Sequence, residues 1–192
     1  VEEGGKTCIW QDGLDIPLVN ALEANDYAVF DGKQPLVAPV NQLPQTFDGN
    51  GLVPADFVWD KPYSPLFKYS WKKVYPALLE AQKVNEPNPF DGIFMRYSNP
   101  LTGGHVMQTM GAAIQLLPAG FKGKAHKHTG SFVYQCAKGK GYSIINGKRF
   151  DWKERDIFCV PSWAWHEHHN LSETEDACLF NFNDLPVIEK LG

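Results

Sequence analysis

The chain has 192 residues, of which 43% are hydrophobic and 13% aromatic, and its formal net charge is −4. This length allows one large domain, or one domain with an appendage, around a hydrophobic core. The sequence has no cluster of Lys and Arg of the kind that predicts nucleic-acid binding, and no apolar run near the roughly 18 residues of a membrane-spanning helix. We therefore expect no nucleic-acid partner and no membrane insertion.

The beginning of the chain is similar to its end. In both places an apolar strand pattern is followed by an aspartate, an apolar residue and a proline, starting at Asp15 and at Asp184. A repeat with such a long period indicates a duplicated domain. We predict that residues 1–20 are the last strand and exit of a preceding barrel. Residues 21–90 would then be a helical and extended segment between two barrels, and residues 91–192 a second barrel.

Two helices and one extended segment are predicted before residue 91. Residues 18–31 have a short amphipathic helix pattern, whereas residues 32–66 are rich in Pro, Gly and Asn and are expected to wrap a neighbour. Residues 70–84 form the second predicted helix, with Ser70 as its cap. Pro76 predicts a late start or a kink in this helix. The expected apolar face of the second helix is formed by Leu78, Leu79 and Ala81.

From Asp91 onward the pattern is one of short strands and turns. Asn146-Gly147 joins two strands within 141–150 and predicts a hairpin with a type I′ turn. Many short strands separated by turn residues predict an antiparallel sandwich or barrel, so the fold class is mostly β with a few N-terminal helices. The other predicted strands are one that begins near residue 92, 111–117, 132–137, a short buried strand at 156–160, 164–169 and 177–183.

The four cysteines are Cys8, Cys136, Cys159 and Cys178, and none of them forms a CxxC pair. Each lies in an apolar segment that is typical of a strand. We predict buried structural thiols in a reducing compartment, which makes the cytoplasm the expected location. A thiolate metal site is disfavoured by the scattered positions.

Five of the six histidines lie between residues 120 and 170. Side chains at i and i+2 of a strand share a face, so His126 and His128 are expected to point the same way, as are His166 and His168. One such pair is as easily structural as functional. Two pairs on strands that an antiparallel barrel can place opposite each other predict a metal site. Three neutral imidazoles suit Fe(II), Zn, Cu or Ni better than Mg or Ca.

The spacing of these histidines resembles the two motifs of the cupin superfamily. Gly120 is followed after five residues by His126 and His128, and PSWAWHEHHN has the second motif's spacing, with Trp163 where glycine is usual. The resemblance implies a cupin jelly-roll barrel. It also implies that His126, His128 and His166 are the metal ligands. The glutamate of the first motif is missing, and Phe132 stands in its place.

A narrower resemblance is to the gentisate 1,2-dioxygenases and their salicylate and 1-hydroxy-2-naphthoate relatives, which are bicupins. It rests on IWQDGLDIPLVNALEANDY, SNPLTGG, AAIQLLPAGFKGKAHKHT, PSWAWHEHHN and DLPVIEKLG. It implies the C-terminal part of an Fe(II) enzyme of the extradiol type. Such an enzyme uses O2 to open a hydroxylated aromatic acid between its carboxyl-bearing and hydroxyl-bearing carbons. The long wrapping segment and the duplicated barrel suggest a homo-oligomer, with a tetramer as the expected form.

The substrate would chelate the metal through its carboxylate and hydroxyl, so a hydrogen-bonding or basic group is expected beside it. His168 is the first candidate and Gln115 the second, and a purely structural histidine or glutamine is the alternative. Asn181 and Tyr134 stand where the family has an aspartate and an arginine, so they depart from its pattern. Arg96 could bind a carboxylate as a bidentate donor, or be an ordinary surface arginine. The residues expected to bind substrate are Arg96, Tyr134, Trp163 and Asn181, with Trp163 and Trp165 either lining the pocket or packing in the core.

Two alternatives remain on the sequence alone. The chain could be a metal-binding scaffold half of a bicupin enzyme without its own catalysis, which Tyr134 and Asn181 keep open. It could also be another cupin oxygenase or an isomerase. Such relatives usually keep the glutamate of the first motif, so Phe132 weighs against this second alternative.

Overall fold

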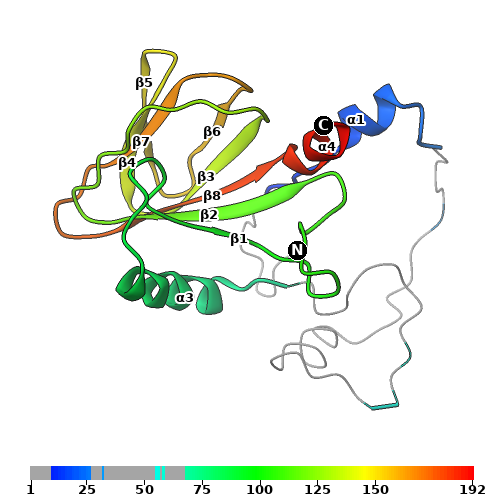
Figure 1. The fold of residues 1–192 in the computed structure, drawn as a ribbon, viewed down its shortest axis with the longest axis horizontal. Coiled ribbons are helices and arrows are strands. Elements are labelled where there is room, and N and C mark those ends of the chain that lie inside the picture. Colours follow the sequence, from blue (N-terminus) through cyan, green and yellow to red (C-terminus); the bar gives the residue numbers. More distant parts are fainter. Residues whose placement is uncertain (1–9, 27–31, 33–54, 57, 59–67) are drawn as a thin grey trace. The chain divides into compact units, whose positions relative to one another are not determined.

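The computed structural model describes residues 10–26, 32, 55–56, 58 and 68–192, and it divides into one unit up to residue 35 and another from residue 36 onward. The predicted wrapping segment lies mostly outside the described residues. The described helices are α1 (Ile16–Ala21), α3 (Trp71–Val84) and α4 (Leu185–Leu191) (Figure 1). Among them, none is long and apolar enough to cross a membrane. The strands are β1 (Ile93–Arg96), β2 (Gly111–Leu117), β3 (Phe132–Lys138), β4 (Lys140–Ile145), β5 (Lys148–Lys153), β6 (Ile157–Val160), β7 (His166–Asn170) and β8 (Ala177–Asn183).

Two antiparallel sheets form the second unit. One has five strands in the order β1-β2-β8-β3-β6, and the other has three in the order β5-β4-β7 (Figure 1). This arrangement confirms the prediction of a mostly β, cupin-like fold with few helices. Because β8 pairs with both β2 and β3, the last strand joins the two halves of the larger sheet.

The register of the larger sheet decides which side chains share its inner face. Ala113 on β2 and Tyr134 on β3 both pair with Asn181 on β8. Directly paired residues of antiparallel strands point to the same side, so these three side chains form one row across the sheet. Arg96 on β1 pairs with Ala113 and extends the row to the exposed edge.

The core has two parts. The first lies between the sheets and takes buried side chains from both, including Leu179 of the larger sheet and Trp152 of the smaller one. The second lies between the outer face of the larger sheet and α3, where Leu78 packs with Ile93, Ile114, Leu116 and Cys178. The two-layer arrangement follows from the strand pattern, because each strand of a barrel wall buries alternate residues.

Helix α3 begins at Trp71 with Ser70 at its N-cap, although the serine side chain makes no cap hydrogen bond. The predicted apolar face is confirmed, since Leu78 is buried and Leu79 and Ala81 pack against it. Pro76 does not delay the start of the helix, so the late start is wrong, whereas the kink stays a prediction. The proline lies inside the helix, where packing of the apolar face against the sheet outweighs the lost backbone hydrogen bond.

The first predicted helix is shorter than residues 18–31. Helix α1 ends at Ala21 because Glu23 adopts a left-handed backbone with φ 51°. The amide of Glu23 donates to the Asn20 carbonyl and that of Ala24 to the Val19 carbonyl, which closes the helix in a Schellman motif. Residues 27–31 of the predicted helix lie outside the described part of the chain. Both α1 and α4 begin after an aspartate and carry a proline in their first turn. The internal repeat stays a prediction.

The predicted hairpin is confirmed, because Asn146 and Gly147 both have positive φ, as a type I′ turn requires. The strand at 156–160 was predicted to be buried, and this burial is wrong. It is β6, an edge strand, and Ile157 is 51% exposed. Cys159 on the same strand is exposed, whereas Cys136 and Cys178 are buried as expected. Alternation along a strand does not reveal whether a further strand covers it.

Candidate metal centre

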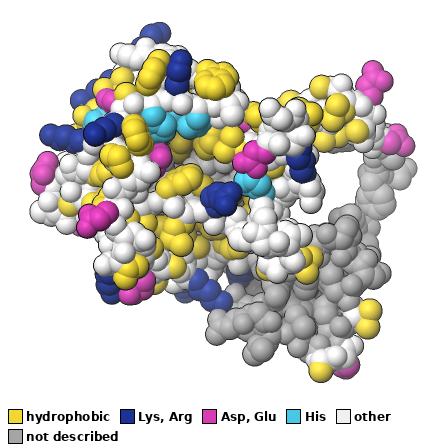
Figure 2. Space-filling view, in the orientation of Figure 1, with side chains coloured by type: hydrophobic (Ala, Val, Ile, Leu, Met, Phe, Trp, Pro, Cys, Tyr) yellow, Lys and Arg dark blue, Asp and Glu magenta, His cyan; other side chains and the backbone are white. Residues whose placement is uncertain are grey.

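Three histidines converge at one end of the space between the sheets. The segment that carries His126 and His128 runs antiparallel to β7, and His126 and His166 exchange both backbone hydrogen bonds at 3.0 and 2.8 Å. The three residues each offer a ring nitrogen, and these atoms all lie within 4.8 Å of one another. His166 is buried, while His126 and His128 are partly exposed, so the site is open on one side. Histidine side chains reach the surface among hydrophobic and basic ones in Figure 2.

Backbone carbonyls hold the far nitrogen of each of these imidazoles. The Nδ1 atoms of His128 and His166 lie 2.9 Å from the carbonyls of Thr129 and Ala164, and Nδ1 of His126 lies 3.4 Å from that of Lys124. A carbonyl only accepts, so each Nδ1 carries the proton and each Nε2 lone pair is left for a metal.

The buried Nε2 of His166 shows how well the site fits a metal. This atom has no hydrogen-bond partner among the described residues, and the residue is 1% exposed. A buried polar atom without a partner costs free energy unless a ligand satisfies it. Burial lowers the pKa of His166 to about 4, and the neighbouring His126 and His128 add to that effect. The imidazole is therefore neutral at physiological pH, as metal binding requires.

The low pKa of His166 predicts an acid-sensitive metal-free protein. Unfolding restores the pKa to about 6.5, so the unfolded chain binds a proton first as the pH falls. Stability is expected to be unaffected above about pH 6.5 and to fall by up to about 3 kcal/mol on approaching pH 4. Urea unfolding of chelator-treated protein would measure this. His166→Asn should reduce the decline, and the same decline in both proteins would contradict the assignment.

A buried hydrogen-bond chain orients the fourth histidine of the motifs. Trp152 Nε1 donates to Ser143 Oγ at 2.9 Å, and Ser143 Oγ lies 2.7 Å from Nδ1 of His168. The serine hydroxyl accepts from the indole and also hydrogen-bonds His168 Nδ1, which fixes the orientation of the ring. His168 Nε2 is buried and has no partner among the described residues. Burial and the neighbouring His166 lower the pKa of His168, which keeps the ring neutral.

Of the two predicted substrate residues that depart from the family pattern, Tyr134 lies beside this histidine and Asn181 is paired with Tyr134 in the larger sheet. Tyr134 is 2% exposed, and its ring centroid lies 4.8 Å from that of His168. Burial raises the pKa of Tyr134, so its phenol stays protonated. Asn181 is fully buried and its Nδ2 has no partner among the described residues. Phe132, which replaces the motif glutamate, is buried with its ring 4.6 Å from that of His128.

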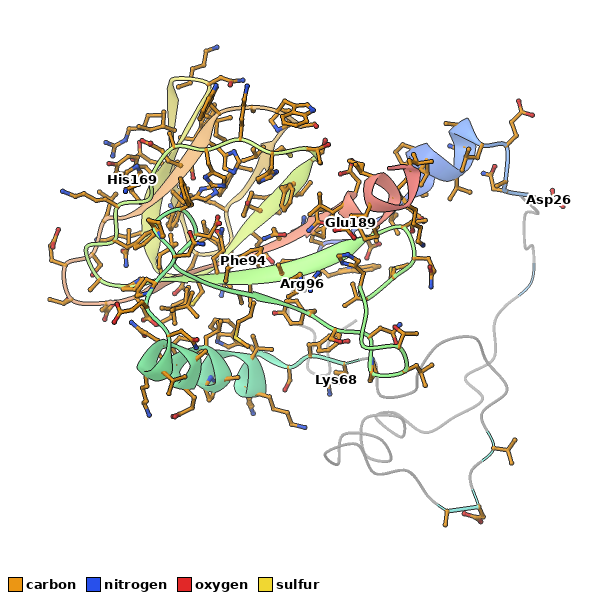
Figure 3. The ribbon with its side chains drawn as sticks, in the orientation of Figure 1. Asp26, Lys68, Phe94, Arg96, His169 and Glu189 are labelled. Carbon is orange, nitrogen blue, oxygen red and sulfur yellow. The ribbon has the colours of Figure 1, made fainter. Side chains whose placement is uncertain are left out.

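The other predicted site residues are divided between the interior and the surface. Gln115 is fully buried on the inner face of β2, whereas Arg96 is exposed on the edge strand β1 (Figure 3). Trp163 and Trp165 are 62% and 52% exposed, so neither packs in the core. Trp163 has φ 62° at the place where cupins usually have glycine, and its amide donates to the His128 carbonyl at 2.9 Å.

Three residues near the histidines were not identified from the sequence. Ser143 and Trp152 orient His168, and Asp91 lies with its Oδ1 3.7 Å from Nε2 of His126. Burial raises the pKa of Asp91, while the neighbouring histidines and a hydrogen bond from Gln115 oppose that rise. The sequence shows turn residues around Asp91. The short distance between Asp91 and His126 depends on tertiary packing, which local sequence does not show.

Comparisons with known proteins agree with this geometry. A cupin domain model matches residues 113–182. The chain is 36% identical to gentisate 1,2 dioxygenase 1 from Aquipseudomonas alcaligenes over 194 residues, covering 100% of this chain and 54% of the relative. It is 30% identical to a 1-hydroxy-2-naphthoate 1,2-dioxygenase from Nocardioides sp. strain KP7, covering 98% and 48%. The chain is a cupin-domain homologue of the ring-cleaving 1,2-dioxygenases.

The fold of this cupin agrees with that assignment. It superposes on the crystal structure of a salicylate 1,2-dioxygenase from Pseudaminobacter salicylatoxidans with a TM-score of 0.74 and 27% identity, over 92% of this chain and 51% of the other. The family resemblance drawn from the motifs is therefore confirmed. This cupin spans about half the length of the curated relatives that it matches.

Proposed function

We propose that this cupin holds Fe(II) on His126, His128 and His166 and opens gentisate or a related hydroxylated aromatic acid with O2. The observation that carries the proposal is the convergence of one ring nitrogen from each of the three histidines, together with a backbone carbonyl at each Nδ1 that leaves Nε2 for a metal. In such a site, bound iron brings a chelating substrate and O2 together and lets charge pass between them. The names of the relatives support the substrate class, because they act on gentisate, 5-aminosalicylate and 1-hydroxy-2-naphthoate.

His168 serves in this proposal as a hydrogen-bond donor to the substrate. Ser143 Oγ holds Nδ1, so Nε2 is the atom offered to the interior, and the proposal takes Ser143 as the donor and Nε2 as the protonated nitrogen. A donor at this place would hold the carboxylate or hydroxyl oxygen of a bound aromatic acid. Gln115 offers the complementary atom, since its buried Oε1 has no partner among the described residues. Tyr134, Asn181, Arg96 and Trp163 remain candidates for substrate contact. Tyr134 lies beside His168, and Asn181 is paired with Tyr134.

The cellular setting belongs to the same proposal. The free thiols of Cys136, Cys159 and Cys178 support a reducing compartment such as the cytoplasm. A homo-oligomer, with a tetramer as the expected form, is supported by an apolar hollow of about 420 Å³ on the outer face of the larger sheet. Tyr97, Ile114 and Phe180 are among its lining residues.

Metal exchange tests the proposal directly. The purified chain would be stripped with a chelator, reloaded with Fe(II) or Zn(II) without oxygen, and mixed with gentisate in air. We expect O2 uptake and a ring-opened product, followed in the near UV, from the Fe(II) form only, because Zn(II) has no accessible redox chemistry.

The two alternatives give different results in this experiment. A metal-binding scaffold would retain both metals and consume no O2. Another type of cupin oxygenase would consume O2 with a different substrate and leave gentisate intact. Salicylate, 5-aminosalicylate and 1-hydroxy-2-naphthoate would be compared in the same assay to define the substrate range.

A further inference from the structure

A carboxylate lies beside the histidine triad although the first motif has lost its acid. Asp91 Oδ1 is 3.7 Å from Nε2 of His126, the atom that faces the proposed metal. Two atoms that each lie about 2.1 Å from one ion can be at most about 4.2 Å apart. The Asp91 carboxylate is therefore within reach of an ion that His126 binds.

The turn that carries Asp91 is held firmly. Asn88 and Gly92 exchange backbone hydrogen bonds at 2.8 and 2.9 Å across the turn, and Asn88 Oδ1 accepts from the Phe90 amide at 2.8 Å. Gly92 has φ 70°, and a Cβ there would lie 2.4 Å from the Leu116 carbonyl oxygen. Glycine is thus required at this position, both for its backbone conformation and for the close approach to β2.

The same turn is docked on the segment that carries the first two histidines. The Lys124 amide donates to the Pro89 carbonyl at 2.8 Å, and the Phe90 ring lies edge-on, 5.2 Å from that of His126. At Gly123 a Cβ would come within 2.9 Å of the Phe90 carbonyl oxygen, so a larger residue would separate the two segments. The position of Asp91 relative to His126 therefore follows from the packing of the backbone.

Gln115 orients the carboxylate from the other side. Its Nε2 donates to Asp91 Oδ1 at 2.8 Å from the inner face of β2. The reversed amide would place two acceptors against each other, so the donor must face Asp91. Asp91 thus lies between the neutral amide of Gln115, which donates to it, and His126, a proposed metal ligand.

The negative charge of Asp91 would affect a cation bound by the three histidines. Three neutral imidazoles leave the full charge of a divalent cation uncompensated, and Phe132 adds none. One negative charge at the edge of the centre would stabilise the bound cation. We propose that Asp91 is a fourth functional group of the metal centre, which raises its affinity for divalent cations from a position outside the two cupin motifs. This inference rests on the proposed metal site.

The test compares metal affinity in two variants that lose one negative charge each. Asp91→Asn keeps the shape of the side chain, whereas Glu189→Gln loses the same charge on α4, beside His105 at 2.9 Å. Figure 3 shows Glu189 on α4, well separated from His169 of the barrel. Calorimetry of the chelator-treated chain with Co(II) should show a Kd raised about 10- to 100-fold in Asp91→Asn. Glu189→Gln should stay within about twofold of the unmodified protein.

Two further measurements distinguish a wrong role for Asp91 from a wrong assignment of the histidine triad. Asp91→Glu keeps the charge and should bind Co(II) more tightly than Asp91→Asn, provided that circular dichroism shows both to be folded. Equal affinities of these two variants, or an unchanged Kd in Asp91→Asn, would overturn the role of Asp91. If His166→Ala also bound Co(II) as tightly as the unmodified chain, the triad itself would be wrong.

Discussion

Replacing His166 with alanine is expected to abolish metal retention by this chain. His166 is the buried member of the triad, with its Nδ1 bonded to the Ala164 carbonyl at 2.9 Å and its Nε2 without a partner among the described residues. Losing this ligand should weaken binding by more than the roughly 100-fold that is typical for losing a hydrogen-bond partner of a metal ligand. The proposed ring-opening activity should fall with the metal content, because no substrate chelation would remain.

Elemental analysis after dialysis would measure the metal retained per chain. His169→Ala is the matched control, because His169 lies on the same strand with its side chain on the other face, 3.0 Å from Glu167. That variant should keep its metal. Equal losses in the two variants would mean that β7 is merely damaged by substitution, and the ligand assignment would lose its support.

Replacing Gly141 with alanine is expected to destabilise the barrel by at least about 3 kcal/mol. Gly141 lies in β4 between β5 and β7, where it pairs with Trp152 and Asn170. A Cβ would stand 2.1 Å from the His169 carbonyl oxygen and 2.3 Å from the Trp152 ring. The first obstacle is backbone of the sheet and cannot move alone. The second is the indole that supports Ser143 and His168, so the site should be disturbed as well.

Urea unfolding of the two proteins at neutral pH would measure the change in free energy. Gly104→Ala is the control, because the nearest atom to its Cβ would be Thr102 Oγ1 at 3.5 Å. This change should alter stability by no more than about 0.5 kcal/mol. A free energy of unfolding for Gly141→Ala within about 1 kcal/mol of the unmodified protein would show that β4 can move away from β7.

The histidine triad and Asp91 are positioned by two different kinds of structure. The histidines come from paired segments, so backbone hydrogen bonds set both their spacing and their protonation. Asp91 comes from a turn before β1 and is placed by packing against Gly123 and Leu116. A change in the turn should therefore alter affinity while leaving the three ligands in place, which is why the Asp91 variants are informative.

Local patterns in the sequence determined much of the barrel. Strands β2 and β8 begin and end where alternation predicted, and Asn146-Gly147 placed the hairpin, because these signals depend only on neighbouring residues. The i, i+2 spacing predicted two histidine pairs, because such residues share a face in any strand. The resemblance to the cupin motifs implied that His126, His128 and His166 are the three ligands, and these three histidines lie together in the structure. The length of helix α1 was overestimated, because nothing in the sequence pattern shows that Glu23 takes a left-handed backbone.

Tertiary structure alone decided the environment of each group. Cys159 is exposed, whereas Val160, the next residue of β6, is 1% exposed, so burial depends on which face of the strand the rest of the fold covers. Asp91 meets His126, and Ser143 meets Trp152 and His168, only because the strand register brings together residues that are distant in the chain. Residue type and local spacing therefore reveal which side chains can bind a metal. The proton positions and the nearby charge, which set how strongly they bind it, come from contacts that only the folded barrel makes.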